Sequence, residues 1–338
     1  MTTQPTRREG HPDSAGANIS LANVTKDYGH DRGVFGLTLE VAPGEAMGFL
    51  GANGAGKTVT MRTLMGFIKP GTGTARIAGL DCFSERAEVQ RLVGYLPGEV
   101  TCPEDLTGRD FLRLVADLRG SRDSKRTNDL LERFELDPTA KIGTMSKGTK
   151  QKVALVAAFM DTPQVLLLDE PTSGLDPVMQ DRFVELVAEE RRRGATVLLS
   201  SHQFGEVERT CDRVAFIRSG HLVGVRSLAE IRAGQRHAFA VTFASPEEAN
   251  RYRTSARAAH VAVADAAADK TALTVELTGT TDAFVKELAG FSVAGLTSRE
   301  QTLEDLFRHI YEGGRPDTSN DTSTAEPSPT NQNQEASR

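Results

Sequence analysis

The chain lacks any apolar run long enough to cross a lipid bilayer. Its clearest runs, Val153–Met160 and Val165–Leu168, fall well short of the roughly 20 residues that a spanning helix needs. The opening segment, Met1–Ser20, is polar and contains no stretch with the pattern of a signal peptide. We therefore expect a cytosolic protein that reaches a membrane only by docking onto another protein.

Cysteine is also scarce. The sequence contains Cys82, Cys102 and Cys211, and no pair of them has the CxxC spacing. This pattern predicts neither a disulfide framework nor a zinc site. We interpret the three residues as small thiols that are buried or half-buried.

The chain has no excess of positive charge. Its 40 Lys and Arg residues stand against 46 Asp and Glu residues, which gives a net charge of −6. General nucleic-acid binding favours a basic surface, so the sequence argues against nucleic acid as a partner.

Residues 19–232 alternate short β-rich runs with longer helical patterns. The clearest runs are Ala46–Leu50, Val165–Leu168 and Thr196–Ser200. This alternation is typical of an α/β domain with a largely parallel sheet. Within it, residues 82–160 are predicted to be mostly helical.

The rest of the chain divides into two tails and a second small unit. Residues 1–18 and 313–338 are predicted to be disordered, the latter because it has almost no apolar residue to bury. Residues 236–312 are predicted to fold as an α+β unit of ferredoxin-like order, βαββαβ, followed by a last helix at Thr302–Tyr311. Its elements are expected at Ala238–Phe243, Pro246–Tyr252, His260–Ala264, Leu273–Leu277, Asp282–Ala289 and Ser292–Thr297.

A glycine-rich loop follows the first of the buried runs and precedes a helical pattern. In this context the glycines let backbone N–H groups curl around phosphate oxygens, and the helix N-terminus attracts the same negative charge. Lys57 can reach the β- and γ-phosphates, and the Thr58 hydroxyl can ligate Mg²⁺. The alternative is a glycine-rich turn with no role in binding, and the position of the loop between a strand and a helix argues against it. The predicted nucleotide-binding residues are Gly51, Ala52, Asn53, Gly54, Ala55, Gly56, Lys57, Thr58 and Val59.

Two carboxylates end the second buried run. Asp169 lies where a Mg²⁺-binding carboxylate is expected, and Glu170, one residue later, can take a proton from an attacking water. Alone this pattern is weak, because many strands end in acidic loops. About a hundred residues after a phosphate-binding loop, it becomes a strong indication of nucleotide hydrolysis.

The glycine-rich loop and the two carboxylates are followed by further motifs within residues 19–232. In this order, the motifs resemble those of the ATP-binding subunit of ABC transporters. Met145–Gln151 resembles the family's signature motif, although it departs from the common LSGGQ form. A serine hydroxyl, a glycine backbone and a helix N-terminus make a second anion site there. The resemblance implies that Ser146, Lys147, Gly148 and Thr149 contact the ATP held by an opposite subunit.

Other segments carry further parts of the resemblance. Tyr28 resembles the aromatic residue that stacks on adenine, Asp176 lies in a loop that resembles the one crossing the dimer interface, and His202 resembles the switch histidine next to the γ-phosphate. Gly98 is a departure, because the family usually has a glutamine there that touches Mg²⁺ and the attacking water. Glu99, or backbone and water, is our hypothesis for its replacement.

The resemblance implies a P-loop NTPase fold of the ABC cassette type, with a RecA-like core, an antiparallel β subdomain and a helical subdomain. The small C-terminal unit also resembles extensions seen in the family, with Thr302–Phe307 as its closing segment. We expect an ATPase that uses ATP and Mg²⁺, with Glu170, His202 and Lys57 as its catalytic residues.

The expected partners are a second copy of the chain, in an ATP-sandwich homodimer, and a polytopic permease on the inner face of the plasma membrane. The expected role is to power an exporter of a drug-like or lipid-like substrate. Two alternatives stay open: an importer ATPase, and a soluble ABC ATPase that acts on DNA or ribosomes. The sequence does not name the cargo.

Overall fold

The structure is a computed structural model that describes residues 18–120, 124–233, 238–255, 260–265, 271–277 and 281–299. Residues 1–17 of the predicted leader, the helix at Thr302–Tyr311 and the tail lie outside these ranges. The domain limits set out above stay a prediction. No helix within the described ranges combines the length and the hydrophobicity needed to span a bilayer.

A six-stranded sheet forms the centre of the larger part of the molecule, in the order β10-β9-β3-β8-β7-β6. Its strands are parallel except β10, which pairs antiparallel with β9. Every residue of β3, β7 and β8 is buried, which explains why each of these strands contains a continuous apolar run. The strands are β3 (Ala46–Leu50), β6 (Val93–Leu96), β7 (Val165–Asp169), β8 (Thr196–Ser201), β9 (Arg213–Arg218) and β10 (His221–Ser227).

A second, antiparallel sheet has the order β2-β1-β4-β5. Along β2 the residues Val34, Leu37, Leu39 and Val41 are buried while others between them are exposed, so one face of this sheet packs on a core. That core also contains Met61 and Leu64 of the first helix. The strands are β1 (Ile19–Asp27), β2 (Gly33–Val41), β4 (Thr72–Ile77) and β5 (Leu80–Asp81).

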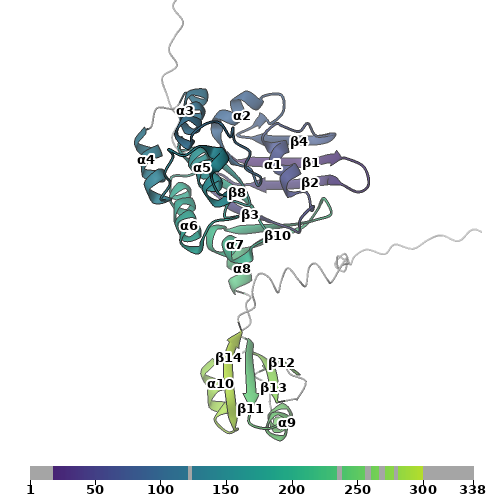
Figure 1. The fold of residues 1–338 in the computed structure, drawn as a ribbon. Coiled ribbons are helices and arrows are strands. Elements are labelled where there is room, and N and C mark those ends of the chain that lie inside the picture. The colour runs from purple at the N-terminus through teal and green to yellow at the C-terminus, as the bar shows by residue number, and fades with distance from the viewer. Residues whose placement is uncertain are drawn as a thin grey trace, which may run out of the picture.

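The helices gather mainly on the side of the central sheet away from β1, β2 and β4, where α3, α4, α5 and α6 lie together (Figure 1). The range 82–160, predicted to be mostly helical, also contains strand β6, which pairs with β7 in the central sheet. The helices are α1 (Lys57–Leu64), α2 (Arg86–Leu92), α3 (Gly108–Arg119), α4 (Ser124–Arg133), the 3₁₀ turn η1 (Ile142–Thr144), α5 (Lys147–Phe159), α6 (Pro177–Arg192), α7 (Phe204–Thr210) and α8 (Leu228–Ala233).

The C-terminal elements follow the order β, α, β, β, α, β that the sequence predicts. Their antiparallel sheet has the order β12-β13-β11-β14, so β13 lies between the two strands that α9 connects. Phe239, Phe243, Tyr252 and Phe284 are buried in a core of their own. The elements are β11 (Ala238–Phe243), α9 (Pro246–Ser255), β12 (His260–Asp265), β13 (Ala272–Leu277), α10 (Thr281–Leu288) and β14 (Val293–Arg299).

Candidate functional site

The glycine-rich loop connects the end of β3 to the start of α1, and two of its glycines are required by their surroundings. Gly56, the residue before α1, has a φ of 109°, a backbone conformation that favours glycine. A Cβ at Gly56 would lie 2.8 Å from Val34 Cγ1, and one at Gly51 would lie 2.5 Å from the Ile217 carbonyl oxygen. The loop is therefore packed tightly against β2 and β9, which leaves its backbone as the lining of the site.

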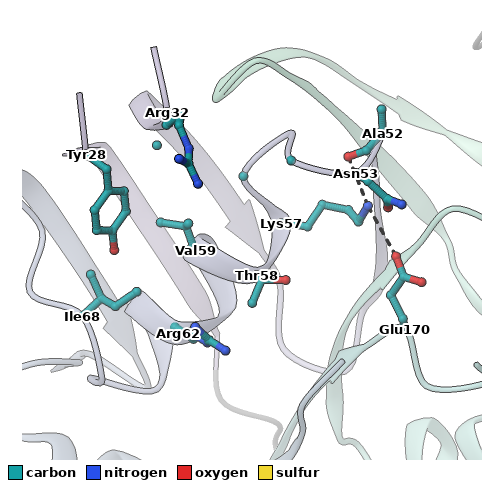
Figure 2. Close-up of a pocket in the computed structure, with 13 residues that line it drawn as sticks. Tyr28, Arg32, Ala52, Asn53, Lys57, Thr58, Val59, Arg62, Ile68 and Glu170 are labelled. Carbon is teal, nitrogen blue, oxygen red and sulfur yellow. Dashed lines mark hydrogen bonds and ion pairs between the residues drawn. The ribbon is translucent and has the colours of Figure 1, made fainter. Parts of the chain in front are cut away.

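Lys57 is the buried cation of this loop, with only 6% of the residue exposed. Its Nζ donates hydrogen bonds to the carbonyl oxygens of Gly51, at 2.7 Å, and Ala52, at 3.4 Å. It also lies 3.5 Å from Glu170 Oε1, as Figure 2 shows. The ammonium group is thus held inside the loop by weak acceptors that phosphate oxygens can replace.

Thr58 and Asp169 meet beside this lysine. Thr58 Oγ1 donates a hydrogen bond of 2.8 Å to Asp169 Oδ2, and Ser200 Oγ donates to Asp169 Oδ1. Asp169 is buried at the carboxyl end of β7, directly opposite Ser200 of β8. These side chains come together because parallel strands place their carboxyl ends at the same edge of the sheet.

The two oxygens of Thr58 and Asp169 fit the way Mg²⁺ binds in phosphate sites. Mg²⁺ usually takes one or two protein ligands and completes its coordination with waters and substrate phosphates. In the described part of the chain, no group of three or more His, Cys, Asp and Glu residues could hold a metal ion. A site made of two protein oxygens that is completed by a nucleotide agrees with that finding.

Glu170 bridges Lys57 and His202. Its Oε2 lies 2.6 Å from His202 Nδ1, while its backbone N–H donates to the Ser200 carbonyl oxygen at 3.0 Å. Glu170 has a φ of 51°, an uncommon conformation for a residue with a side chain. Such strain persists only where the surroundings impose it, and it often marks a functional site.

The sequence did not predict that Gln151 stabilises the turn that carries Glu170. Gln151 of α5 is buried, and its Nε2 donates to the carbonyl oxygens of Pro171, at 2.9 Å, and Glu170, at 3.5 Å. Gln151 ends the Met145–Gln151 motif, so its position was visible in the sequence. Its contact with a turn 19 residues away was not.

A cavity of about 640 Å³ opens over the loop, and Figure 2 shows the side chains around it. Tyr28, which is about half exposed, forms one wall with Val59 and Ile68, while Lys57 and Glu170 lie on the other side. Arg32, Gly33, Arg62 and Ile68 were not predicted to line it. The cavity is lined by Tyr28, Arg32, Gly33, Ala52, Asn53, Gly54, Gly56, Lys57, Thr58, Val59, Arg62, Ile68 and Glu170.

The signature segment lies at the start of α5, and its residues are not among those that line this cavity. Ser146 is the N-cap of α5 and accepts a hydrogen bond from the Thr149 N–H at 3.1 Å. Lys147 Nζ donates to Ser173 Oγ at 3.4 Å, and a Cβ at Gly148 would lie 2.6 Å from the Gly174 carbonyl oxygen. The structure thus brings the signature to the loop before α6 and not to the phosphate-binding loop of the same chain.

Asp176, predicted to lie at a dimer interface, is the N-cap of α6. Its Oδ1 accepts a hydrogen bond of 3.0 Å from the Met179 N–H. A helix cap is a complete local explanation for this aspartate. Any contact with nucleotide stays a prediction.

Comparison with known proteins agrees with this geometry. The family model described as "ABC transporter" matches residues 34–173. The bacitracin transport ATP-binding protein BcrA of Bacillus licheniformis is 36% identical over 210 residues, which cover 61% of this chain and 68% of that protein. The chain belongs to the ABC transporter family. It is an ATP-binding subunit of that family and an ATPase.

Two further similarities point the same way. The Nod factor export ATP-binding protein I of Paraburkholderia xenovorans is 38% identical over 213 residues, covering 61% of this chain and 70% of that protein. A solved structure of an ATP-binding subunit of an ABC transporter is 30% identical, with a TM-score of 0.60, and covers 64% of this chain and 92% of that one. The predicted fold class, a P-loop NTPase of the ABC cassette type, is thereby confirmed.

Gly98 is an unusual feature of this ABC subunit. It lies in a small cavity of about 220 Å³ with Thr58, Arg62, Tyr95, Glu99 and Asp169 among its lining residues. A Cβ at Gly98 would lie 3.2 Å from both Cγ and Oδ2 of Asp169. The backbone at Gly98 therefore approaches the Asp169 carboxylate more closely than a residue with a side chain easily can.

The ATPase site also contains a buried carboxyl that the sequence reasoning did not single out. Glu206 on α7 is 8% exposed, and burial raises its pKa to about 7. Hydrogen bonding to the hydroxyls of Ser201 and Thr172 opposes this shift, and the nearby Glu170 carboxylate adds to it. In the sequence Glu206 is an ordinary acidic residue in the first turn of a helix, so nothing there indicates its burial.

Proposed function

We propose that this ABC subunit hydrolyses ATP between two copies of itself. The observation that carries the proposal is the arrangement of Glu170, which lies 3.5 Å from Lys57 Nζ and 2.6 Å from His202 Nδ1. A carboxylate between the phosphate-binding lysine and a histidine can accept a proton from water beside the γ-phosphate. The Ser146–Thr149 segment, remote from this chain's own cavity, supplies the second anion site to the ATP of the partner.

The proposed mechanism of ATP hydrolysis follows from the charged and polar groups of the site. When triphosphate enters the loop, its oxygens replace the Gly51 and Ala52 carbonyls as acceptors for Lys57, which releases Glu170 from its ion pair. Tyr28 stacks on adenine, and His202 contacts the γ-phosphate and orients the water. Thr58 and Asp169 would hold Mg²⁺, which neutralises charge on the β- and γ-phosphates.

Binding and hydrolysis then change the strength of the dimer. ATP brings negative charge to two helix N-termini from different chains, α1 of one copy and α5 of the other, and so joins them. Hydrolysis removes part of this bridge and lets the copies separate. We propose that a polytopic permease on the inner face of the plasma membrane uses this movement.

The direction we propose is export of a drug-like or lipid-like substrate. The relatives named for bacitracin transport and Nod factor export support it. The net charge of −6 supports transport over action on DNA or ribosomes, because nucleic-acid partners favour a basic surface.

The dimer is tested with turnover blocked. The Glu170→Gln full-length chain is analysed by light scattering with ATP and Mg²⁺, with ADP, and without nucleotide, alone and with its membrane partner. We expect the mass to double only with ATP. A chain that stays monomeric under all these conditions contradicts the shared site.

The permease is tested separately. Affinity purification of the full-length chain from detergent-solubilised membranes of its source cells should recover a polytopic membrane protein that stimulates ATP hydrolysis. Recovery of ribosomes or DNA instead, with no such membrane protein, supports the soluble alternative.

A further inference from the structure

Glu206 lies directly behind the turn that carries His202. Ser201 Oγ donates a hydrogen bond of 2.6 Å to Glu206 Oε2, and the same hydroxyl accepts one of 2.9 Å from the Gln203 N–H. Both residues that flank His202 are therefore connected to one buried carboxylate. The histidine itself is about half exposed, and its Nδ1 lies 2.6 Å from Glu170 Oε2.

The same carboxyl lies beside the segment that carries Glu170. Thr172, two residues after Glu170, is buried and lines a cavity of about 230 Å³ together with Glu206 and Gln203. Hydrogen bonding to the Thr172 hydroxyl favours the charged form of Glu206 and so opposes the rise in its pKa that burial causes. Glu206 is thus bonded to the histidine turn through Ser201 and shares a small cavity with Thr172 of the glutamate turn.

Helix α7 gives this carboxyl a firm base. Val207 packs so closely on β3 that a Cβ at Gly48 would lie 2.4 Å from Val207 Cγ1. Thr210 Oγ1 donates to the Glu206 carbonyl oxygen at 2.6 Å. Because α7 is packed on the central strand that leads into the phosphate-binding loop, Glu206 has a fixed position relative to that loop.

Helix capping does not account for the carboxylate. Glu206 is the third residue of α7, where a glutamate in a capping box accepts from the N–H of the N-cap residue. Here the N-cap is Gln203, and its N–H donates to Ser201 Oγ instead. The Glu206 side chain is directed to the catalytic turns, at the desolvation cost that burying a carboxylate carries.

We propose that Glu206 is a positioning residue of the ATPase site, which ties the turn carrying His202 to the turn carrying Glu170 and so holds His202 Nδ1 at 2.6 Å from Glu170 Oε2. The inference rests on the proposed roles of His202 and Glu170. It assigns Glu206 no contact with ATP. Its loss should therefore affect turnover and leave nucleotide binding almost unchanged.

The test compares two substitutions of Glu206 in the full-length chain. Glu206→Leu fills the same space without an acceptor, and we expect kcat for ATP to fall roughly tenfold with KM within about twofold. Glu206→Gln keeps an oxygen that can accept from Ser201, and we expect it to retain most of the activity. Glu185→Gln, an exposed position on α6, is the matched control and should behave as wild type.

A double-mutant cycle separates positioning from a merely structural role. If Glu206 acts through His202, then Glu206→Leu should lower kcat little further in a His202→Ala background. An undiminished tenfold loss in that background overturns the proposal, and so does an unchanged kcat for Glu206→Leu in the wild-type background. Ser201→Ala, which removes the donor from the other end of the same bond, should reproduce the loss of kcat if the leucine variant does not fold.

The outcomes also distinguish this inference from the proposed function. A wild-type chain that binds no ATP, or whose activity is insensitive to both His202→Ala and Glu170→Gln, contradicts the proposed function. A wild-type chain that needs both residues but tolerates Glu206→Leu contradicts the positioning role alone.

Discussion

Thr58 Oγ1 donates a hydrogen bond of 2.8 Å to Asp169 Oδ2, across 111 positions of the sequence. The bond joins the first residues of α1 to the last residue of β7. It places a hydroxyl and a carboxylate side by side next to Lys57. The fold therefore brings together residues that are far apart in the sequence at the phosphate-binding end of the site.

Replacing Lys57 with alanine should weaken ATP binding at least tenfold. The ammonium group is the buried cation of the loop, and a charge-assisted hydrogen bond to phosphate contributes about 1.5–3 kcal/mol. Calorimetric titration with ATP and Mg²⁺ measures the change. Lys69→Ala, at an exposed position outside the cavity, is the control. Unchanged affinity in the Lys57 variant would refute its role in the phosphate cradle.

Replacing Glu170 with glutamine should slow hydrolysis at least a hundredfold and leave ATP binding intact, because general-base catalysis contributes about 10²–10⁴ in rate. The amide keeps the shape of the side chain and loses its basicity. Phosphate release under saturating ATP measures the rate, with Glu88→Gln on the exposed surface of α2 as the control. Normal turnover would show that another group takes the proton.

The sequence predicts most of the catalytic end of the site because its residues lie in continuous motifs. Asp169 and Glu170 lie at the end of the apolar run of β7, and Lys57 and Thr58 begin the helix that follows the glycine-rich loop after β3. The sheet then brings them together by the general rule that the carboxyl ends of parallel strands share an edge. Neither step requires knowledge of distant contacts.

Other features depend on tertiary packing and could not be predicted in this way. Strand β6 is short and lies among helical patterns, so only its pairing with β7 reveals it. Arg32 and Ile68 line the cavity because separate loops fold over it. Glu206 looks like a first-turn helix acid, and its burial follows from the close packing of α7 on β3 at Gly48. Local sequence contains no signal for such contacts.

A side chain at position 98 should disturb Asp169. The Cβ of Gly98→Ala would lie 3.2 Å from the Asp169 carboxylate, so the loop or the carboxylate has to shift. Displacing a catalytic group in this way should lower kcat about tenfold or more. We expect Gly98→Gln, which restores the residue usual in the family, to lower the rate as well.

The matched control for Gly98→Ala is Gly224→Ala on β10, where the added Cβ meets only Arg226 Nη1, at 3.6 Å. Steady-state ATP hydrolysis of the purified chains measures all three variants. A large rise in the rate of Gly98→Gln would contradict the steric argument. It would show instead that the site with Gly98 lacks a side chain that speeds hydrolysis.

The stability of the protein should carry a pH dependence that originates at Glu206. Burial raises the pKa of this carboxyl from its ordinary 4.5 to about 7 in the folded chain. Between these values the folded state holds a proton that the unfolded state releases, so the contribution to stability is fully present below pH 4.5 and is lost as the pH rises towards about 7. Two nearby residues also affect the pKa of Glu206: Glu170 raises it and His202 lowers it.

Glu206→Gln removes this titration and keeps a neutral side chain of the same shape. The free energy of unfolding of the variant relative to wild type should therefore increase with pH across this window, by on the order of 3 kcal/mol at most. Urea unfolding of both chains from about pH 4.5 to about pH 8 measures the difference between their free energies of unfolding. The titration of the carboxylates that both chains contain cancels in this difference. Glu185→Gln, exposed on α6, should show no such trend. A difference for Glu206→Gln that stays constant with pH would mean that Glu206 titrates as an ordinary carboxyl in the folded protein.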